Sequence, residues 1–310
     1  MSDWDDFESV PPGHRSGFVA VIGRPNVGKS TLMNRFLGQK IAIVSPKPQT
    51  TRTRIRGILT REEAQVIFVD TPGLHKPLHA LGEVMVATAA RAIPDADVVL
   101  FMVDSSVLPT EEDQMIARMI SERTQNPVIL VLNKMDHLPA ERVKPHTEAY
   151  WELLPDYAGW MMTIATQGAN LGELLEMIIE HLPEGPRYYP GDQITDQTER
   201  DIAAELVREQ VLRFTRHEVP HATAVVVKEF KERENGVVYI SATIYVERES
   251  QKGIVIGAGG KMLRRIGTAA RKEIERMVGG RIYLDLWVKV SEKWRRDLRR
   301  IQEIGYTSST

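Results

Sequence analysis

Residues 23–30, which read GRPNVGKS, restrict the fold of this chain more than any other stretch. They fit the pattern G-x-x-x-x-G-K-[ST], follow the β-rich run GFVAVIG at 17–23 and open a helical pattern over 29–38. A glycine-rich turn between a strand and a helix directs several backbone N–H groups at one point, where phosphate oxygens bind. The stretch therefore predicts a phosphate-binding loop. A chance glycine turn is the alternative, and the flanking strand and helix disfavour it.

Individual residues of this loop have separate predicted roles. Gly23 and Gly28 let the backbone curl around phosphate. Lys29 reaches the β- and γ-phosphates, and Ser30 offers its hydroxyl to Mg²⁺. The predicted nucleotide contacts are Gly23, Arg24, Pro25, Asn26, Val27, Gly28, Lys29, Ser30 and Thr31.

The rest of the N-terminal part alternates between apolar runs and helical patterns. The runs lie at 65–70, 97–104, 127–133 and 160–165, several with apolar residues at successive positions. Such runs are typical of strands buried on both faces of a parallel sheet. Helical patterns lie at about 80–92, 111–124, 141–154 and 171–182. The alternation predicts an α/β fold, a P-loop domain with a mostly parallel sheet.

The motif DTPG follows the run at 65–70. Asp70 can hold Mg²⁺ through water, and the N–H of Gly73 can contact the γ-phosphate, with Thr71 and Pro72 between them. Mg²⁺ coordination also needs a threonine between the two motifs. The segment PQTTRTR at 48–54 supplies Thr50 and Thr51, of which we favour Thr51. Because the segment is polar, we expect it to be mobile without a γ-phosphate.

The motif NKMD, residues 133–136, predicts the choice of base. The Asp136 carboxylate can accept hydrogen bonds from N1–H and the 2-amino group of guanine, and adenine offers neither donor. Two lost charge-assisted bonds, at roughly 1.5–3 kcal/mol each, would reject ATP. We expect Asn133 to brace the loop and the stem of Lys134 to lie on the base. The predicted ligand is GTP or GDP.

The pattern changes after a stiff connector, HLPEGPRYYPGDQ at 181–193. A helix, two strands, a helix, a strand and a final helix at about 291–304 then predict a small α+β domain. The expected division is a flexible tail over 1–16, a GTPase domain over 17–183, a linker over 184–197 and an RNA-binding domain over 198–310. Residues 1–200 have a net charge of −8 and residues 201–310 of +6, which points to a polyanion at the C-terminal part.

The second part contains GIVIGAGGKMLRR at 253–265. A dinucleotide fingerprint fails because Met262 stands where its third glycine belongs. The I-G-x-x-G pattern fits the loop with which KH modules clamp about four nucleotides. The alternative is a glycine-rich helix start packed on a neighbour. The predicted RNA contacts are Lys252, Ile256, Gly257, Ala258, Gly259, Gly260, Lys261, Arg264, Arg265 and Lys272.

In their order, the nucleotide motifs resemble those of the translation-factor-related GTPases of the TrmE-Era-EngA-like branch. Together with the second part, residues from about 17 to 306 resemble the ribosome-biogenesis GTPases with a C-terminal type II KH domain. The resemblance implies GTP hydrolysis with Mg²⁺, binding of single-stranded RNA near the 3′ end of small-subunit rRNA, and a role in assembly and maturation of the small ribosomal subunit. No DNA partner is expected.

Two positions depart from relatives. Leu74 stands where Ras-like enzymes have a water-orienting Gln, so we expect slow or assisted hydrolysis. The resemblance implies that Asn26 helps a K⁺ ion replace an arginine finger. Ile164 replaces the usual Ser before Ala165, whose N–H we still expect to face the guanine oxygen.

Other functional classes have less support in the sequence. The chain has no cysteine, which excludes disulfides and thiolate metal sites, and its acidic N-terminus predicts no secretory signal. We expect a cytoplasmic location. A GTP-using metabolic or tRNA-modifying enzyme would need a second reactive site, and no motif supplies one. A peripheral contact with the inner face of the cell membrane, through the basic segment 291–304, stays an alternative.

Overall fold

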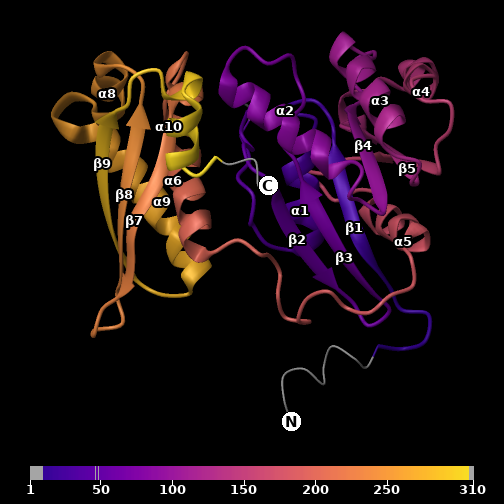
Figure 1. The fold of residues 1–310 in the computed structure, drawn as a ribbon, viewed down its shortest axis with the longest axis horizontal. Helices are drawn as coiled ribbons and strands as arrows, with labels where there is room; N and C mark the ends of the chain where they lie inside the picture. The colour runs from indigo at the N-terminus through magenta and orange to yellow at the C-terminus, as the bar shows by residue number, and fades with distance from the viewer. Residues whose placement is uncertain (1–9, 46, 48, 307–310) are drawn as a thin grey trace. The chain divides into compact units, whose positions relative to one another are not determined.

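The computed structural model describes residues 10–45, 47 and 49–306, which form two compact units (Figure 1). The first unit holds the chain up to Ala42, Thr51–Lys76 and Met85–Asp196. The second holds Ile43–Thr50, Pro77–Val84 and the chain from Gln197 onward. Two short segments within the range 17–183 thus pack with the second unit. Residues 1–9 of the expected tail lie outside the described residues, and the first strand begins at Arg15.

A six-stranded sheet with the order β2-β3-β1-β4-β5-β6 forms the centre of the first unit. All neighbouring pairs are parallel except β2 and β3, which are antiparallel. The strands are β1 (Arg15–Ile22), β2 (Ile55–Thr60), β3 (Ala64–Asp70), β4 (Val98–Asp104), β5 (Val128–Asn133) and β6 (Gly159–Thr163). The helices are α1 (Lys29–Leu37), α2 (Ala80–Ala92), α3 (Glu111–Arg123), α4 (Val143–Trp151) and α5 (Leu171–His181).

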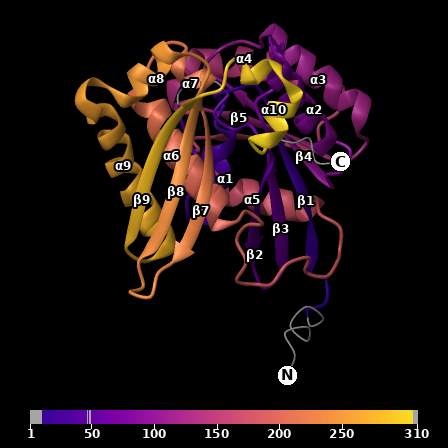
Figure 2. The same ribbon diagram turned by 60° about the vertical axis from the view of Figure 1, so that its left-hand side comes forward.

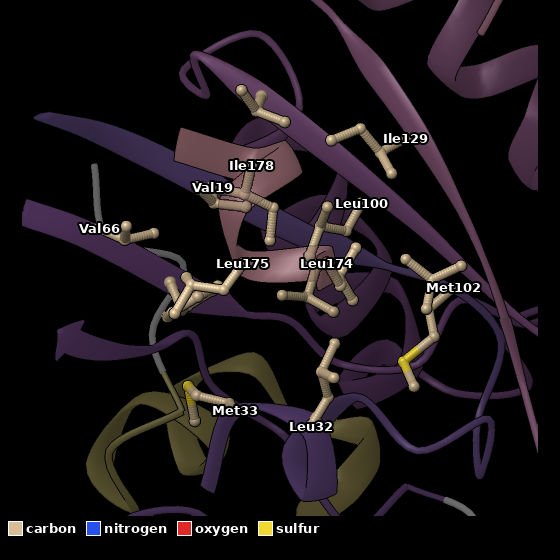
Figure 3. Close-up of a cluster of buried hydrophobic side chains, with 14 of the residues drawn as sticks. Val19, Leu32, Met33, Val66, Leu100, Met102, Ile129, Leu174, Leu175 and Ile178 are labelled. Atoms are coloured by element: carbon tan, nitrogen blue, oxygen red, sulfur yellow. The ribbon is translucent and has the colours of Figure 1, made fainter. Parts of the chain in front are cut away.

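Successive strand residues point to opposite faces of this sheet, and helices cover both faces. Leu32 and Met33 of α1 and Leu174 of α5 pack against residues such as Val19 on one face, as Figure 3 shows. On the other face, α3, α4 and the C-terminal half of α2 cover a second cluster that includes Phe101. The doubly covered parallel sheet confirms the predicted α/β fold.

The connector after α5 is hydrogen-bonded to the first unit. The Gln65 side chain accepts from the amides of Tyr188 and Tyr189 at 2.7 and 3.0 Å and donates to the Tyr189 carbonyl at 2.8 Å. Further along, the amide of Ile58 in β2 donates to the Ile194 carbonyl at 2.8 Å. The connector therefore follows the edge of the sheet as far as residue 196.

A three-stranded sheet and the helices around it make up most of the second unit. Strands β7 (Ala224–Glu232) and β8 (Val238–Val246) are antiparallel, and β8 and β9 (Ile282–Val290) are parallel. The helices are α6 (Glu199–Phe214), α7 (Val219–Ala222), α8 (Glu249–Ile256), α9 (Lys261–Val278) and α10 (Leu298–Glu303). The apolar faces of α6, α8 and α9 share one core with the sheet (Figure 2).

Four elements differ from the sequence-based expectation. Strand β2 and helices α7 and α8 were not predicted, and the continuous helix expected over 291–304 is wrong. A 3₁₀ turn, Trp294–Arg296, and the short α10 replace it. Trp294 is fully buried and donates to the Ala222 carbonyl at 2.9 Å, so its ring belongs to the interior. None of the described helices is long and apolar enough to span a bilayer.

Candidate functional site

The carboxyl ends of four parallel strands bring the nucleotide motifs to one edge of the sheet. β1 leads into the phosphate loop, β3 ends at Asp70, β4 at Asp104 and β5 at Asn133. Val21 is in register with Asp70, and Asp104 with Asn133. In open α/β sheets, ligands bind outside this edge. Motifs separated along the chain therefore face a common space.

The phosphate loop is held in shape by its own backbone and by Lys29. Gly28 has φ 113°, and a Cβ there would lie 2.4 Å from Nδ2 of Asn133, so no other residue fits. Helix α1 begins at Lys29 with Gly28 as its N-cap, which leaves its first N–H groups for a ligand. The Lys29 ammonium donates to the carbonyls of Gly23 and Arg24, both at 3.0 Å. Burial lowers the pKa of Lys29 to about 8.

Three oxygen-bearing side chains converge beside the loop. Ser30 Oγ lies 2.9 Å from Thr51 Oγ1 and donates to Asp70 Oδ2 at 2.6 Å, and Thr51 Oγ1 lies 3.4 Å from the same oxygen. Asp70 is fully buried, and its Oδ1 has no hydrogen-bond donor within the described part of the chain. Burial raises the pKa of this carboxyl against the opposing charge of Lys29, and a divalent cation beside it would further stabilise its ionised form.

This group of atoms fits Mg²⁺, a hard cation that prefers oxygen ligands. Thr50, the other candidate, donates instead to the Lys47 carbonyl at 2.6 Å. No cluster of three or more His, Cys, Asp or Glu side chains occurs among the described residues to suggest another metal centre. The geometry supports the preference for Thr51.

The DTPG segment lies against the phosphate loop. A Cβ on Gly73 would come within 2.6 Å of Pro25 Cα, and the amide of Leu74 donates to the Gly23 carbonyl at 3.2 Å. Thr71 Oγ1 donates to the Val21 carbonyl at 2.8 Å. The Leu74 side chain is fully buried in the apolar cluster on one face of the sheet, so it takes no part in orienting water.

Asn133 connects three parts of the base-recognition region. Its Nδ2 donates to the Val27 carbonyl at 2.7 Å, and its Oδ1 accepts from Thr163 Oγ1 at 3.1 Å and from the Ala165 amide at 3.0 Å. Lys134 Nζ donates to Asp104 Oδ2 at 2.7 Å, which extends its stem along the edge of the sheet. The loop is thus braced through Asn133.

The segment that replaces the usual Ser-Ala box is closed by main-chain bonds. The Ile164 carbonyl accepts from the amides of Gln167 and Gly168 at 3.0 and 2.8 Å. These bonds shape the loop without a serine hydroxyl. Because the Ala165 amide already donates to Asn133, its contact with a guanine oxygen stays a prediction.

Sequence reasoning missed the partner of Arg24. Its Nε lies 3.3 Å from Oδ2 of Asp113, a fully buried residue of α3. Asp113 also accepts from the amide of Thr110 in a capping box at the start of α3. The motif T-E-E-D could have identified Asp113 as a capping residue. Its pairing with the phosphate loop depends on the tertiary structure.

The glycine loop of the second unit is the centre of the candidate RNA site. It forms a 3₁₀ turn, Ala258–Gly260, between α8 and α9. Gly259 and Gly260 have φ 58° and 76°, and a Cβ on either would meet nothing within 4 Å. Packing therefore does not require these two glycines, whereas the left-handed backbone does. Gly257 differs, since a Cβ there would lie 2.7 Å from Met262 Cβ.

A groove of about 400 Å³ lies between α9 and β9 next to this loop. Gly260, Leu263 and Gly267 of α9 and Leu284 and Leu286 of β9 line it, together with Arg264 and Arg271. A groove lined by apolar side chains and two arginines suits a single nucleic acid strand. Of the other predicted contacts, Lys261, Arg265 and Lys272 line a different cavity, and Lys252 pairs with Glu249 at 3.6 Å.

Two protein families match different parts of the chain. Residues 18–134 match the family described as 50S ribosome-binding GTPase, and residues 218–295 match the KH domain family. The chain is 52% identical over 299 residues to GTPase Era of Nostoc sp., covering 96% of this chain and 91% of that protein. It is 50% identical over 292 residues to GTPase Era of Thermotoga maritima, covering 94% and 97%.

Solved structures of Era also match this chain over most of its length. A crystal structure of Era in complex with MgGDPNP and nucleotides 1506–1542 of 16S ribosomal RNA matches with TM-score 0.92 and 41% identity, covering 95% of this chain and 99% of that one. A single-residue variant of Aquifex aeolicus Era bound to GDP.AlF4⁻ matches with TM-score 0.91 and 42% identity, covering 94% and 99%. With the nucleotide motifs at one sheet edge and the glycine loop at the start of α9, these likenesses show that the chain is a GTPase of the Era family.

Proposed function

We propose that this GTPase is a switch that binds ribosomal RNA near the 3′ end of the small-subunit rRNA and assists small-subunit assembly and maturation in the cytoplasm. The relative solved with MgGDPNP and nucleotides 1506–1542 of 16S ribosomal RNA supports both ligands. The groove beside the glycine loop supports RNA as the partner of the second unit.

The hydrolytic site is proposed to stabilise charge rather than to supply a strong base. Lys29 and a magnesium ion held by Ser30, Thr51 and Asp70 would neutralise the charge that develops on the β- and γ-phosphates. The N–H of Gly73 would position the γ-phosphate for in-line attack by water. Since Leu74 is buried, water is oriented by something other than that side chain, and basal turnover is slow.

Asn26 is proposed to bind K⁺ beside the phosphates. The residue has a left-handed backbone (φ 65°) in the phosphate loop. This conformation is uncommon outside glycine, so the loop specifically positions this residue. A potassium ion there would supply the positive charge of an arginine finger. Turnover should be faster in KCl than in NaCl, and equal rates would refute this role.

The observation that carries the switch proposal is the docking of Ile43–Thr50 on α6. The Val44 amide donates to Glu209 Oε1 at 3.1 Å. Lys47 Nζ donates to the Leu212 carbonyl near the end of α6, and Arg208 of α6 donates to the Thr50 carbonyl. The next residue is Thr51, which the Mg²⁺ site uses. Hydrolysis that releases Thr51 would therefore alter a segment fastened to the RNA-binding unit.

Crosslinking and sequencing of bound RNA with GTP or GDP present tests this function. We expect small-subunit rRNA near its 3′ end, with a yield that depends on the nucleotide. Equal recovery with both nucleotides would contradict the switch, and recovery of unrelated RNA would contradict the target.

A double variant tests whether the glycine loop binds RNA. Ala258→Asp with Gly259→Asp places carboxylates at two exposed positions beside the groove, where they would repel phosphate. RNA binding should fall sharply while intrinsic GTP hydrolysis continues. Unchanged RNA affinity would reject the glycine loop as the RNA site.

Contact with the inner face of the membrane has less support. Leu298 is 57% exposed beside exposed Arg299 and Arg300, but Trp294, the aromatic residue of this segment, is buried. A six-residue α10 offers little apolar area to a bilayer. We therefore propose at most weak binding to anionic vesicles. Sedimentation with vesicles at physiological salt measures it.

A further inference from the structure

A second cavity, of about 540 Å³, lies between α6 and α9. Gln210, Arg213 and Phe214 line it from α6, and Lys261, Arg265 and Lys272 line it from α9. Arg264 and Thr268 line both this cavity and the groove beside β9, so the two spaces adjoin across α9. The glycine-loop motif predicts RNA binding in the groove beside β9 and assigns no role to the second cavity.

The basic side chains of this cavity are not neutralised by the protein. No ion pair involves Arg213, Lys261, Arg265 or Lys272 within the described parts of the two units. The one acidic lining residue, Glu273, pairs with Arg276 at 2.7 Å.

An aromatic ring holds two of the guanidinium groups. Arg265 lies 4.2 Å and Arg213 5.5 Å from the centroid of the Phe214 ring. Cation–π contacts position arginines and leave their N–H groups free to donate. Guanidinium groups that are fixed and carry no acidic partner favour phosphate as a ligand, because each can donate two parallel hydrogen bonds to it.

A buried amide gives independent support for a ligand. Gln210 is 3% exposed, and its Nε2 donates to Glu209 Oε2 at 3.2 Å. Its Oε1 accepts no hydrogen bond from the described part of the chain. A buried acceptor without a donor is unfavourable, and most such groups in folded proteins are paired. The missing donor would come from a ligand that carries a hydroxyl or amino group as well as phosphates. A ribonucleotide has both.

We propose that the α6–α9 cavity is a second RNA-backbone site, which takes the phosphates and a 2′-hydroxyl of the strand that continues from the β9 groove past Arg264. This inference rests on the proposed RNA-binding function and extends it to α6. Arg213 and Lys272 contact phosphates in it, and Gln210 Oε1 accepts from the ribose.

Length-dependent RNA binding tests the proposal. The full chain, loaded with a non-hydrolysable GTP analogue, is titrated with a four-nucleotide RNA that fills the groove and with a twelve-nucleotide RNA containing it. The test variant is Arg213→Ala with Lys272→Ala. Its matched control is Arg118→Ala with Arg123→Ala, which removes two exposed arginines from α3.

The test variant should bind the longer RNA about tenfold more weakly, with a salt slope smaller by about 1.4, since each single-strand phosphate contact contributes about 0.7. Its affinity for the short RNA and its GTP hydrolysis should match those of the control. Equal losses for both lengths, or none, would overturn the second site. If the unaltered protein binds neither RNA, the proposed RNA-binding function fails as well.

Gln210→Leu tests the ribose contact separately. The preference for the longer RNA over DNA of the same sequence should shrink by about threefold, because the 2′-hydroxyl distinguishes the two. The melting temperature reports any purely structural effect. An unchanged preference would contradict the ribose contact. If the unaltered protein binds ATP and the Arg213/Lys272 variant does not, without a length effect, the cavity binds free nucleotides and the RNA assignment is overturned.

Discussion

At the scale of single residues, the nucleotide site consists of buried polar groups whose charges need a ligand. Lys29 is held by carbonyl oxygens that carry no net charge, and Asp70 has an oxygen without a donor in the described part of the chain. Such groups are costly to bury without compensation. Lys29 and Asp70 compensate each other's charge in part, and a triphosphate with Mg²⁺ would supply the further partners.

Lys29→Ala should therefore abolish turnover and weaken GTP binding by about 10- to 100-fold, the size expected when a charge-assisted hydrogen bond to phosphate is lost. Nucleotide titration and single-turnover hydrolysis measure the two effects. Lys144→Ala, on the exposed surface of α4, is the control. Near-normal hydrolysis by the Lys29 variant would refute the phosphate-loop assignment.

Asp136→Asn tests base recognition. Replacing the carboxylate by an amide removes charge-assisted acceptance from guanine N1–H, so GTP affinity should fall by about 10- to 100-fold. ATP affinity, which does not depend on those bonds, should stay the same. Competition of both nucleotides against a fluorescent GDP gives the ratio. Equal losses for GTP and ATP would place Asp136 outside base recognition.

At the scale of elements, the sequence predicted the strands whose apolar residues are successive and missed those without that signal. Strand β2, IRGILT, follows a polar segment that was interpreted through its threonines alone. Helix α8 contains Gly253 and three β-branched residues, which are weak helix formers, and the burial of Val255 outweighs their propensity. The spacing of arginines over 291–304 is also typical of one amphipathic helix, and it led to the wrong prediction there.

The same distinction holds for the candidate site. Motif spacing was enough to propose Ser30, Thr51 and Asp70 as Mg²⁺ ligands, and the structure brings their oxygen atoms together beside the phosphate loop. Local sequence patterns do not predict how helices pack against one another. The pairing of Arg24 with Asp113 and the cavity beside Phe214 depend on that packing, so neither was predicted.

Docking of Ile43–Thr50 on α6 gives the prediction at this scale. Lys47 donates to the carbonyls of Leu212 and Thr215 at the C-terminal end of α6, where a cation is favoured by the helix dipole. Lys47→Met should loosen the segment and bring the ratio of RNA affinities in the GTP and GDP states closer to one. Lys144→Met is the control. An unchanged ratio would show that this segment does not couple the bound nucleotide to RNA affinity.

At the scale of the whole molecule, net charge differs in sign between the N-terminal and C-terminal parts of the chain. The net charge of −8 on residues 1–200 contrasts with +6 on residues 201–310. In the proposed complexes GTP would contact buried groups of the phosphate loop, whereas RNA would contact the groove and exposed basic side chains of the second unit. The two ligands should therefore respond differently to the ionic strength of the solution.

RNA affinity should fall steeply as salt rises, because each phosphate contact releases a counterion. Residues 252–272 include six Lys and Arg and no acidic residue. If all six contact single-stranded RNA, the slope of log K against log salt is about −4. GTP affinity should change far less over the same range, because enclosed charges are screened weakly. Titrations of one preparation with both ligands, from low to physiological salt, make the comparison. A flat RNA profile would mean that phosphate contacts contribute little to RNA binding, and a GTP profile as steep as that of RNA would place the triphosphate on an open surface rather than in the phosphate loop.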